Sequence, residues 1–316
     1  MATYDKIITR DDASALIPDQ KIVSEIIKQV TEQSAILPLL TKLPNMTSKT
    51  ASIAVLSALP EAYWVDGDTG LKQTTNAMWK NKRLTAEEIA VVVPIAENVL
   101  NDSEYDIWAE IQPLIVEQIY KKVDAAIITG EDAPTSWEDA LIPTITAKGN
   151  VLPYNADATT YERISDAMSL VEEDGFDVTG LVGGIKLKGE IRKGLVDANG
   201  QPLANSEVTE LPRVFVKNGA WDSTQADFIV GDFKKGVYAI RNDIEFKVFD
   251  SGVITDNTGA ILYNLMQQDM KALRVTFRIG FALPNSVTAL NGDEDTVFPF
   301  ALAQSATASD DDEGTE

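Results

Sequence analysis

Residues 89–103 read IAVVVPIAENVLNDS, and residues 104–129 read EYDIWAEIQPLIVEQIYKKVDAAIIT. The apolar, β-branched run at residues 89–95 predicts a strand. Asn101, Asp102 and Ser103 supply side chains that commonly cap a helix. Apolar residues then recur at steps of three and four. Together these patterns predict a strand that leads into a helix of about 25 residues, from near residue 104 to residue 129.

The expected long helix has a defined stop and one internal irregularity. Its apolar stripe consists of Ile107, Trp108, Ile111, Ile115, Ile119, Val123 and Ile127. Gly130 fits the stop, because glycine readily adopts the left-handed conformation that ends many helices. Pro113 lies inside the pattern, and a kink or a tightened first segment is expected there because proline has no amide hydrogen.

A strand-like region before this helix predicts a long β-hairpin. Residues 53–56 are a short strand candidate, and residues 63–65 lead into the turn-rich sequence at 66–70. The return passes through Trp79, and the polar segment 71–83 between the arms has no core of its own. Such a hairpin projects from the body and needs another surface to cover its unpaired edges.

The first 45 residues predict an arm rather than a self-contained unit. Residues 21–34 have the pattern of an amphipathic helix, with Ile22, Ile26 and Val30 at helical spacing. Pro38 ends this helix, because proline disfavours helical conformation in the residue before it. One short helix can hardly bury its own apolar stripe, so the arm needs a surface on this chain or on a neighbour.

The second half of the chain predicts a mixed αβ region after a loop-rich stretch that reaches residue 155. Helices are expected at residues 161–174 and 186–194, and Glu172, Glu173 and Asp174 are expected on a solvated surface. Strands are expected at residues 181–184, 212–216, 227–232, 237–240, 244–249 and 271–282. The acidic residues 310–313 lie in a tail that is expected to stay disordered.

Composition narrows the class of function. The 316-residue chain has no cysteine and no histidine, which excludes disulfides and thiolate metal sites and removes imidazole from catalysis. Its net charge of -22 repels phosphate, and its basic residues are scattered, so sequence-specific nucleic-acid binding is not expected. No apolar stretch is long enough to span a membrane. We expect no catalytic residues, no cofactor and no metal site.

The order of arm, long hairpin, spine helix, αβ region and returning strand resembles that of tailed-phage major capsid proteins with the HK97-like fold. The resemblance covers roughly residues 15–290. It is carried by residues 93–103 at the entry to the long helix, 124–134 at its exit, 64–67 and 78–80 in the hairpin, and Arg274, Arg278 and Gly280 in the closing strand.

The resemblance implies an α+β subunit with an N-terminal arm, an extended β-hairpin loop, a long spine helix, and peripheral and axial domains. The implied segments are the arm (1–45), the hairpin loop and its base (46–92), the peripheral domain with the spine helix (93–155), the axial domain (156–245), the returning peripheral strands (246–291) and an acidic C-terminal tail (292–316).

The implied role is structural and not enzymatic. Copies of the chain would form pentamers and hexamers of an icosahedral virion shell, assembled in the host cytoplasm, that encloses double-stranded DNA without reading its sequence. A portal is an implied partner. Many relatives begin with a scaffolding segment of about a hundred residues, whereas here the arm begins almost at Met1, so either a separate scaffolding protein or a chain already mature as written is expected. No membrane partner is expected.

Eight residues in the arm and hairpin are candidates for contacts between subunits. They are Trp64, Lys72, Trp79, Lys80, Lys82, Arg83, Ile22 and Ile26. The basic residues among them could pair with carboxylates of a neighbour, and exposed pairs contribute about 0–1 kcal/mol each. In some relatives a hairpin lysine forms an isopeptide bond to an asparagine of another subunit, a part that Lys72 or Lys80 could play.

Two other interpretations remain open from the sequence. The first uses the same fold and is an encapsulin-type bacterial nanocompartment that holds a protein cargo. The second is a hydrolase that works with paired carboxylates and without imidazole, and such an enzyme would be a monomer or a small oligomer.

Overall fold

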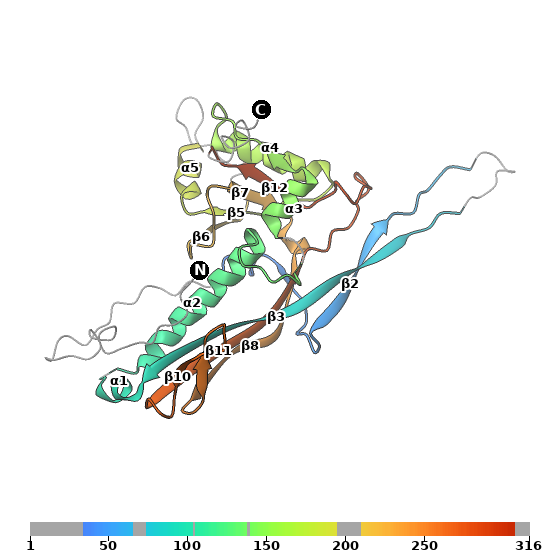
Figure 1. Ribbon diagram of the computed structural model, residues 1–316. Helices are drawn as coiled ribbons and strands as arrows, with labels where there is room; N and C mark the ends of the chain where they lie inside the picture. Colours follow the sequence, from blue (N-terminus) through green and yellow to red (C-terminus); the bar gives the residue numbers. More distant parts are fainter. Residues whose placement is uncertain (1–33, 66–73, 104, 138–139, 195–209, 307–316) are drawn as a thin grey trace. The chain divides into compact units, whose positions relative to one another are not determined.

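A computed structural model describes residues 34–65, 74–103, 105–137, 140–194 and 210–306 (Figure 1). These residues divide into two compact units. The smaller one contains residues 88–120 and 242–278. The larger one takes its described residues from 34–87, 121–241 and 279–306. No helix among the described residues is both long enough and apolar enough to cross a membrane.

The smaller unit is built on parts of three long strands and of the long helix. The strands are β3 (Met78–Ala96), β8 (Val237–Phe249) and β11 (Met270–Ala282), and the helix is α2 (Ile107–Ile128). β11 lies between the other two strands. Its residues Leu273, Val275 and Phe277 alternate with more polar neighbours and are fully buried, as one face of a strand should be. The ring of Tyr120 in α2 meets Phe277 edge-on at 6.3 Å.

The entry to α2 differs from the expectation. A separate short helix, α1 (Glu97–Asp102), follows β3, so Asn101 and Asp102 end α1 and do not cap the long helix. The Asp106 carboxylate caps α2, because it accepts hydrogen bonds from the amides of Trp108 and Ala109 at 3.0 and 3.2 Å. Pro113 lies within α2. The smaller unit also contains the antiparallel pair β9 (Val253–Thr255) and β10 (Ile261–Asn264).

The larger unit contains a second five-stranded sheet, in the order β4-β12-β7-β5-β6. Its strands are β4 (Val151–Leu152), β12 (Phe300–Gln304), β7 (Ala226–Gly231), β5 (Gly180–Gly184) and β6 (Arg213–Val216). The central strand β7 is antiparallel to both β12 and β5. Figure 1 shows the helices α3 (Leu141–Lys148), α4 (Thr160–Glu173) and α5 (Leu187–Gly194) around this sheet.

Local sequence explains why α4 begins and ends as it does. The Thr159 hydroxyl accepts from the amide of Glu162, and the Glu162 carboxylate accepts from the amide of Thr159, which is a complete capping box. Ile164, Ala167 and Val171 then recur on one face and are buried in the core that also contains β7 and β12. The helices predicted at residues 161–174 and 186–194 are confirmed as α4 and α5.

Two predictions for the second half of the chain are wrong, and a third was incomplete. The loop-rich stretch from Gly130 to residue 155 also contains α3. The two strands expected at 237–240 and 244–249 are one continuous strand, β8. The segment 292–316, expected as an acidic tail, contains β12, which is paired on both sides within its sheet. In each case pairing or packing with distant residues outweighs the local polar pattern.

The predicted hairpin is present as β2 (Thr50–Ala58) and the first part of β3. The two strands pair antiparallel from Thr50 opposite Thr85 to Ala58 opposite Met78. The polar segment 71–83 is therefore not all irregular, because its last six residues belong to β3. Beyond the strands, the Glu61 amide donates to the Thr75 hydroxyl at 2.9 Å and links the two arms. The two-residue strand β1 (Thr41–Lys42) pairs with β8 and completes the order β1-β8-β11-β3-β2.

The stop of the long helix is confirmed. Gly130 has φ of +79°, and its amide donates to the Ala125 carbonyl at 3.1 Å. Several expectations lie outside the described residues: most of the arm helix at 21–34 with Ile22 and Ile26, Lys72 in the hairpin, and the acidic residues 310–313.

Candidate assembly surfaces

Exposed aromatic side chains lie along the hairpin, with Trp79 in its paired strands and Trp64 beyond them. Trp64 is 101% exposed and Trp79 is 65% exposed. Tyr63, Val65 and Met78 beside them are also exposed. Large apolar side chains that cluster in contact with water commonly mark a surface that binds another protein. Two of the residues predicted from the sequence, Trp64 and Trp79, thus lie on a surface suited to a partner.

The outer edge of the hairpin also has unused hydrogen-bonding capacity. β2 is the terminal strand of its sheet in the described part of the chain. An edge strand presents amide and carbonyl groups that another chain can pair with. The Leu56 carbonyl is an exception, since it accepts a long hydrogen bond of 3.4 Å from the Val287 amide of the same chain.

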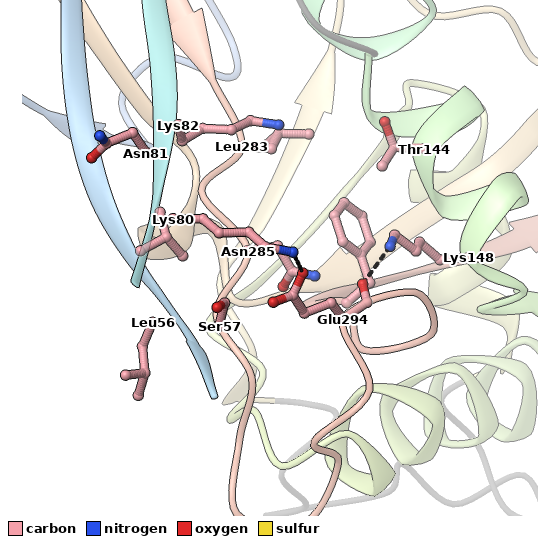
Figure 2. A pocket seen from close by; sticks show the side chains of 12 residues that line it. Leu56, Ser57, Lys80, Asn81, Lys82, Thr144, Lys148, Leu283, Asn285 and Glu294 are labelled. Carbon is pink, nitrogen blue, oxygen red and sulfur yellow. Dashed lines mark hydrogen bonds and ion pairs between the residues drawn. The ribbon is translucent and has the colours of Figure 1, made fainter. Parts of the chain in front are cut away.

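The basic candidates of the hairpin lie closer to the body than its aromatic residues. Lys80 forms an ion pair with Glu294 of its own chain. Lys82 is half-buried and, with Lys80, lines a cavity of about 370 Å³ (Figure 2). Arg83 is exposed and pairs through its backbone with Ser52. Lys80 and Lys82 thus lie together at one pocket.

The pocket lies between the base of the hairpin, α3 and the loop that joins β11 to β12. Figure 2 shows Lys80 from β3 and Lys148 from α3 pointing toward Glu294 from two sides. The Lys148 ammonium donates to the Glu294 carbonyl at 2.6 Å. The hydrogen bond from Lys80 is the main reason that the pKa of the Glu294 carboxyl lies below its ordinary value, and a hydrogen bond from Ser57 adds to the effect.

The smaller unit also exposes large apolar side chains on several elements, and the sequence analysis did not predict this exposure. They are Val92, Leu114, Met266, and the apolar set on β8, β9 and β10, which consists of Phe246, Val248, Phe249, Val253 and Ile261. From Asn242 to Phe249, β8 has no fully buried residue on either face. The adjacent apolar residues Val248 and Phe249, which must point to opposite faces of a strand, were the available signal.

A buried carboxylate in α2 binds the first described residues of the chain, Ser34 and Ala35. Asp124 in α2 is fully buried and accepts hydrogen bonds from the Ser34 hydroxyl at 2.5 Å, the Ala35 amide at 2.9 Å and the Asn218 side chain at 2.7 Å. Burial raises the pKa of Asp124, and these donors oppose that shift. The segment that leads out of the expected arm is therefore tied to the long helix.

Among the described residues, no group of three or more acidic side chains is arranged to hold a metal ion. The features that distinguish this chain are surfaces: the aromatic hairpin, the open edge of β2 and the apolar set on β8, β9 and β10.

Comparison with known proteins gives consistent results. Residues 13–290 match the model of the phage capsid family. The major capsid protein of Staphylococcus phage 80alpha is 26% identical over 269 residues, which are 82% of this chain and 79% of that protein. A solved chain of Microbacterium phage Oxtober96 is 34% identical with a TM-score of 0.79, covering 95% of this chain and 100% of that chain. A solved chain of Mycobacterium phage Cain is 26% identical with a TM-score of 0.81, covering 95% and 99%.

Proposed function

Because the chain belongs to the phage capsid family and has a structural role in the virion capsid, we propose that it is a major capsid protein that forms a closed icosahedral shell. The α+β, HK97-like fold expected from the sequence is confirmed. In the proposed shell, copies of the chain form pentamers and hexamers around a double-stranded DNA genome.

The full exposure of Trp64 is the observation that carries this proposal. The described residues of a single subunit leave this side chain and its aromatic neighbours exposed and the edge of β2 without a neighbouring strand. A neighbouring copy that covers the hairpin would remove this apolar surface from water and pair the free edge. Repeated contacts of this kind close a shell, because each subunit is then held by several others at once.

The proposal assigns further parts of the chain. The apolar set on β8, β9 and β10 is a second contact between copies. The arm, through Ile22 and Ile26, and the basic residues Lys72, Lys82 and Arg83 add contacts around the hairpin. The axial domain at residues 156–245, extended by β12 and α3, meets its copies around the five-fold and six-fold positions.

The partners and location follow from the same premise. The net charge of -22 would keep packaged DNA from adhering to the wall. A separate scaffolding protein and a portal would take part in assembly, which would occur in the host cytoplasm. The chain would act without catalysis, since its proposed work is done by contacts between copies.

The two alternatives predict different particles. An encapsulin-type shell would enclose a protein cargo, whereas the three relatives named above come from phages, which supports the capsid instead. An imidazole-free hydrolase would need a cleft with paired carboxylates. The pocket in Figure 2 is lined by three lysines and only one carboxylate, which argues against it.

The purified full-length chain should assemble into closed particles of megadalton mass. Light scattering coupled to size-exclusion chromatography measures the mass, and electron microscopy shows whether the particles are closed. If assembly requires a scaffolding protein, co-expression with the other structural genes supplies it. A species that stays at the 34.4 kDa of one chain, or a small oligomer, under both conditions would contradict the proposal.

A further inference from the structure

The loop that joins β11 to β12 contacts both strands at the base of the hairpin. Its centre is Glu294, which pairs with Lys80 of β3 and accepts a hydrogen bond from Ser57, near the end of β2. One carboxylate therefore contacts both strands of the hairpin. The backbone bond from Val287 to Leu56 adds a further link between the loop and β2.

The same loop is fixed firmly to the body of the larger unit. The Lys148 ammonium of α3 donates to the Glu294 carbonyl at 2.6 Å. Next to α4, the Asp174 carboxylate accepts from the side chains of Asn150 and Asn291 at 2.9 and 2.6 Å and from the Phe298 amide at 2.9 Å. Asp174 is only 8% exposed, so the expectation that it lies on a solvated surface is wrong.

Glu294 thus lies between a fixed body and a projecting hairpin. We infer that Glu294 is a positioning residue that sets the direction of the hairpin on its own subunit. This inference rests on the proposed function, in which the hairpin must meet a neighbouring copy. Lys80 is in this view part of the support of the hairpin within the subunit.

Because this contact lies at the base of the hairpin, a small change there produces a larger displacement at Trp64. Ser57 and Trp64 are seven residues apart, and an extended chain rises about 3.3 Å per residue, so Trp64 can lie up to about 23 Å beyond the contact. A change of about 10° in the direction of the hairpin base would then move Trp64 by about 4 Å. A shift of that size would misplace an aromatic side chain at an interface whose packing is as dense as a protein interior.

The contact is suited to positioning because it adds little to the stability of the fold. The side chains of Lys80 and Glu294 are 70% and 36% exposed, and exposed pairs stabilise proteins weakly. Loss of the pair should therefore loosen the hairpin base while the unit remains folded.

Glu294→Gln tests the inference. Hydrogen–deuterium exchange on the full-length, unassembled chain should become about threefold faster at residues 52–58 and 79–83, the effect expected for loss of a weak exposed pair. Exchange at β7 should not change. The yield of closed particles should fall although the melting temperature stays the same.

Matched variants separate positioning from a general effect of charge. Asp295→Asn removes the same charge from the next residue, which is exposed, and should leave both exchange and assembly unchanged. The double variant Lys80→Glu with Glu294→Lys reverses the pair and should restore slow exchange and particle yield relative to either single variant.

Two results would overturn the inference. Unchanged exchange at residues 52–58 and 79–83 in Glu294→Gln would show that Glu294 does not hold the hairpin. Faster exchange throughout the unit, with a lower melting temperature, would show that it only stabilises the fold. Neither result depends on whether the hairpin contacts a neighbour, which the tryptophan variants below test separately.

Discussion

Replacing Trp64 and Trp79 together by alanine should abolish closed shells and leave the subunit folded. Both side chains are exposed in the single subunit, so their loss should change its stability by no more than about 0.5 kcal/mol. At an interface between copies, truncation of a buried tryptophan commonly costs about 2 kcal/mol or more. Every copy would lose both contacts, so the loss of binding free energy is repeated at each interface of the shell.

Electron microscopy and light scattering measure the effect on assembly, and thermal unfolding of the unassembled chain measures the effect on stability. Leu290→Ala is a suitable control, because Leu290 is apolar and 74% exposed but belongs neither to the hairpin nor to β8, β9 or β10. Normal shells from the double tryptophan variant would show that the hairpin aromatics do not join subunits.

Asp227→Ala should destabilise the subunit strongly, lowering the free energy of unfolding by about 3–5 kcal/mol. The Arg163 side chain is 7% exposed, and its guanidinium donates to the Asp227 carboxylate at 2.7 Å and to the Gln304 carbonyl at 2.8 Å. It also lies over the ring of Tyr154, 4.9 Å from the ring centre. Removing the carboxylate leaves a buried cation without its counter-charge.

Urea unfolding of the unassembled chain gives this free energy. The double variant Arg163→Met with Asp227→Leu removes both charges and should be less destabilised than Asp227→Ala alone, because no unpaired charge remains. Equal losses in the two variants would mean that the cost comes from lost packing and not from the stranded arginine.

Much of the fold could be predicted from the sequence where apolar residues recur at one regular spacing, that of a helix or that of a strand. The long helix, α4 and β11 each carry a regular apolar pattern over many residues, and most residues of each apolar stripe are buried, although Leu114 of the long helix is exposed. The cap of the long helix was misplaced because Asn101 and Asp102 are good capping residues. The sequence alone does not show that the short helix α1 ends at Asp102 and that Asp106 caps the long helix instead.

Other elements depend on contacts that no local pattern reveals. Phe300–Gln304 precedes an acidic tail, and its place inside a sheet comes from pairing with β7 and β4. Asp174 resembles its neighbours Glu172 and Glu173, but only Asp174 is enclosed by the β11–β12 loop. Burial of this kind is decided by residues more than a hundred positions away.

The exposure of the hairpin tryptophans could be expected from the sequence, because the hairpin has no core of its own, and the structure leaves both side chains exposed. Their contact with a neighbouring copy stays a prediction. The pairing of Lys80 within its own chain requires the position of Glu294, which is 214 residues away. The exposed set on β8 was missed because apolar residues in a strand are normally expected to be buried.

A reconstruction of the assembled particle by electron microscopy at side-chain resolution tests the central claim most directly. We predict closed shells in which Trp64 and Trp79 of each copy are buried against a neighbouring copy. Particles in which both tryptophans remain in solvent, or lie against their own subunit, would contradict the account.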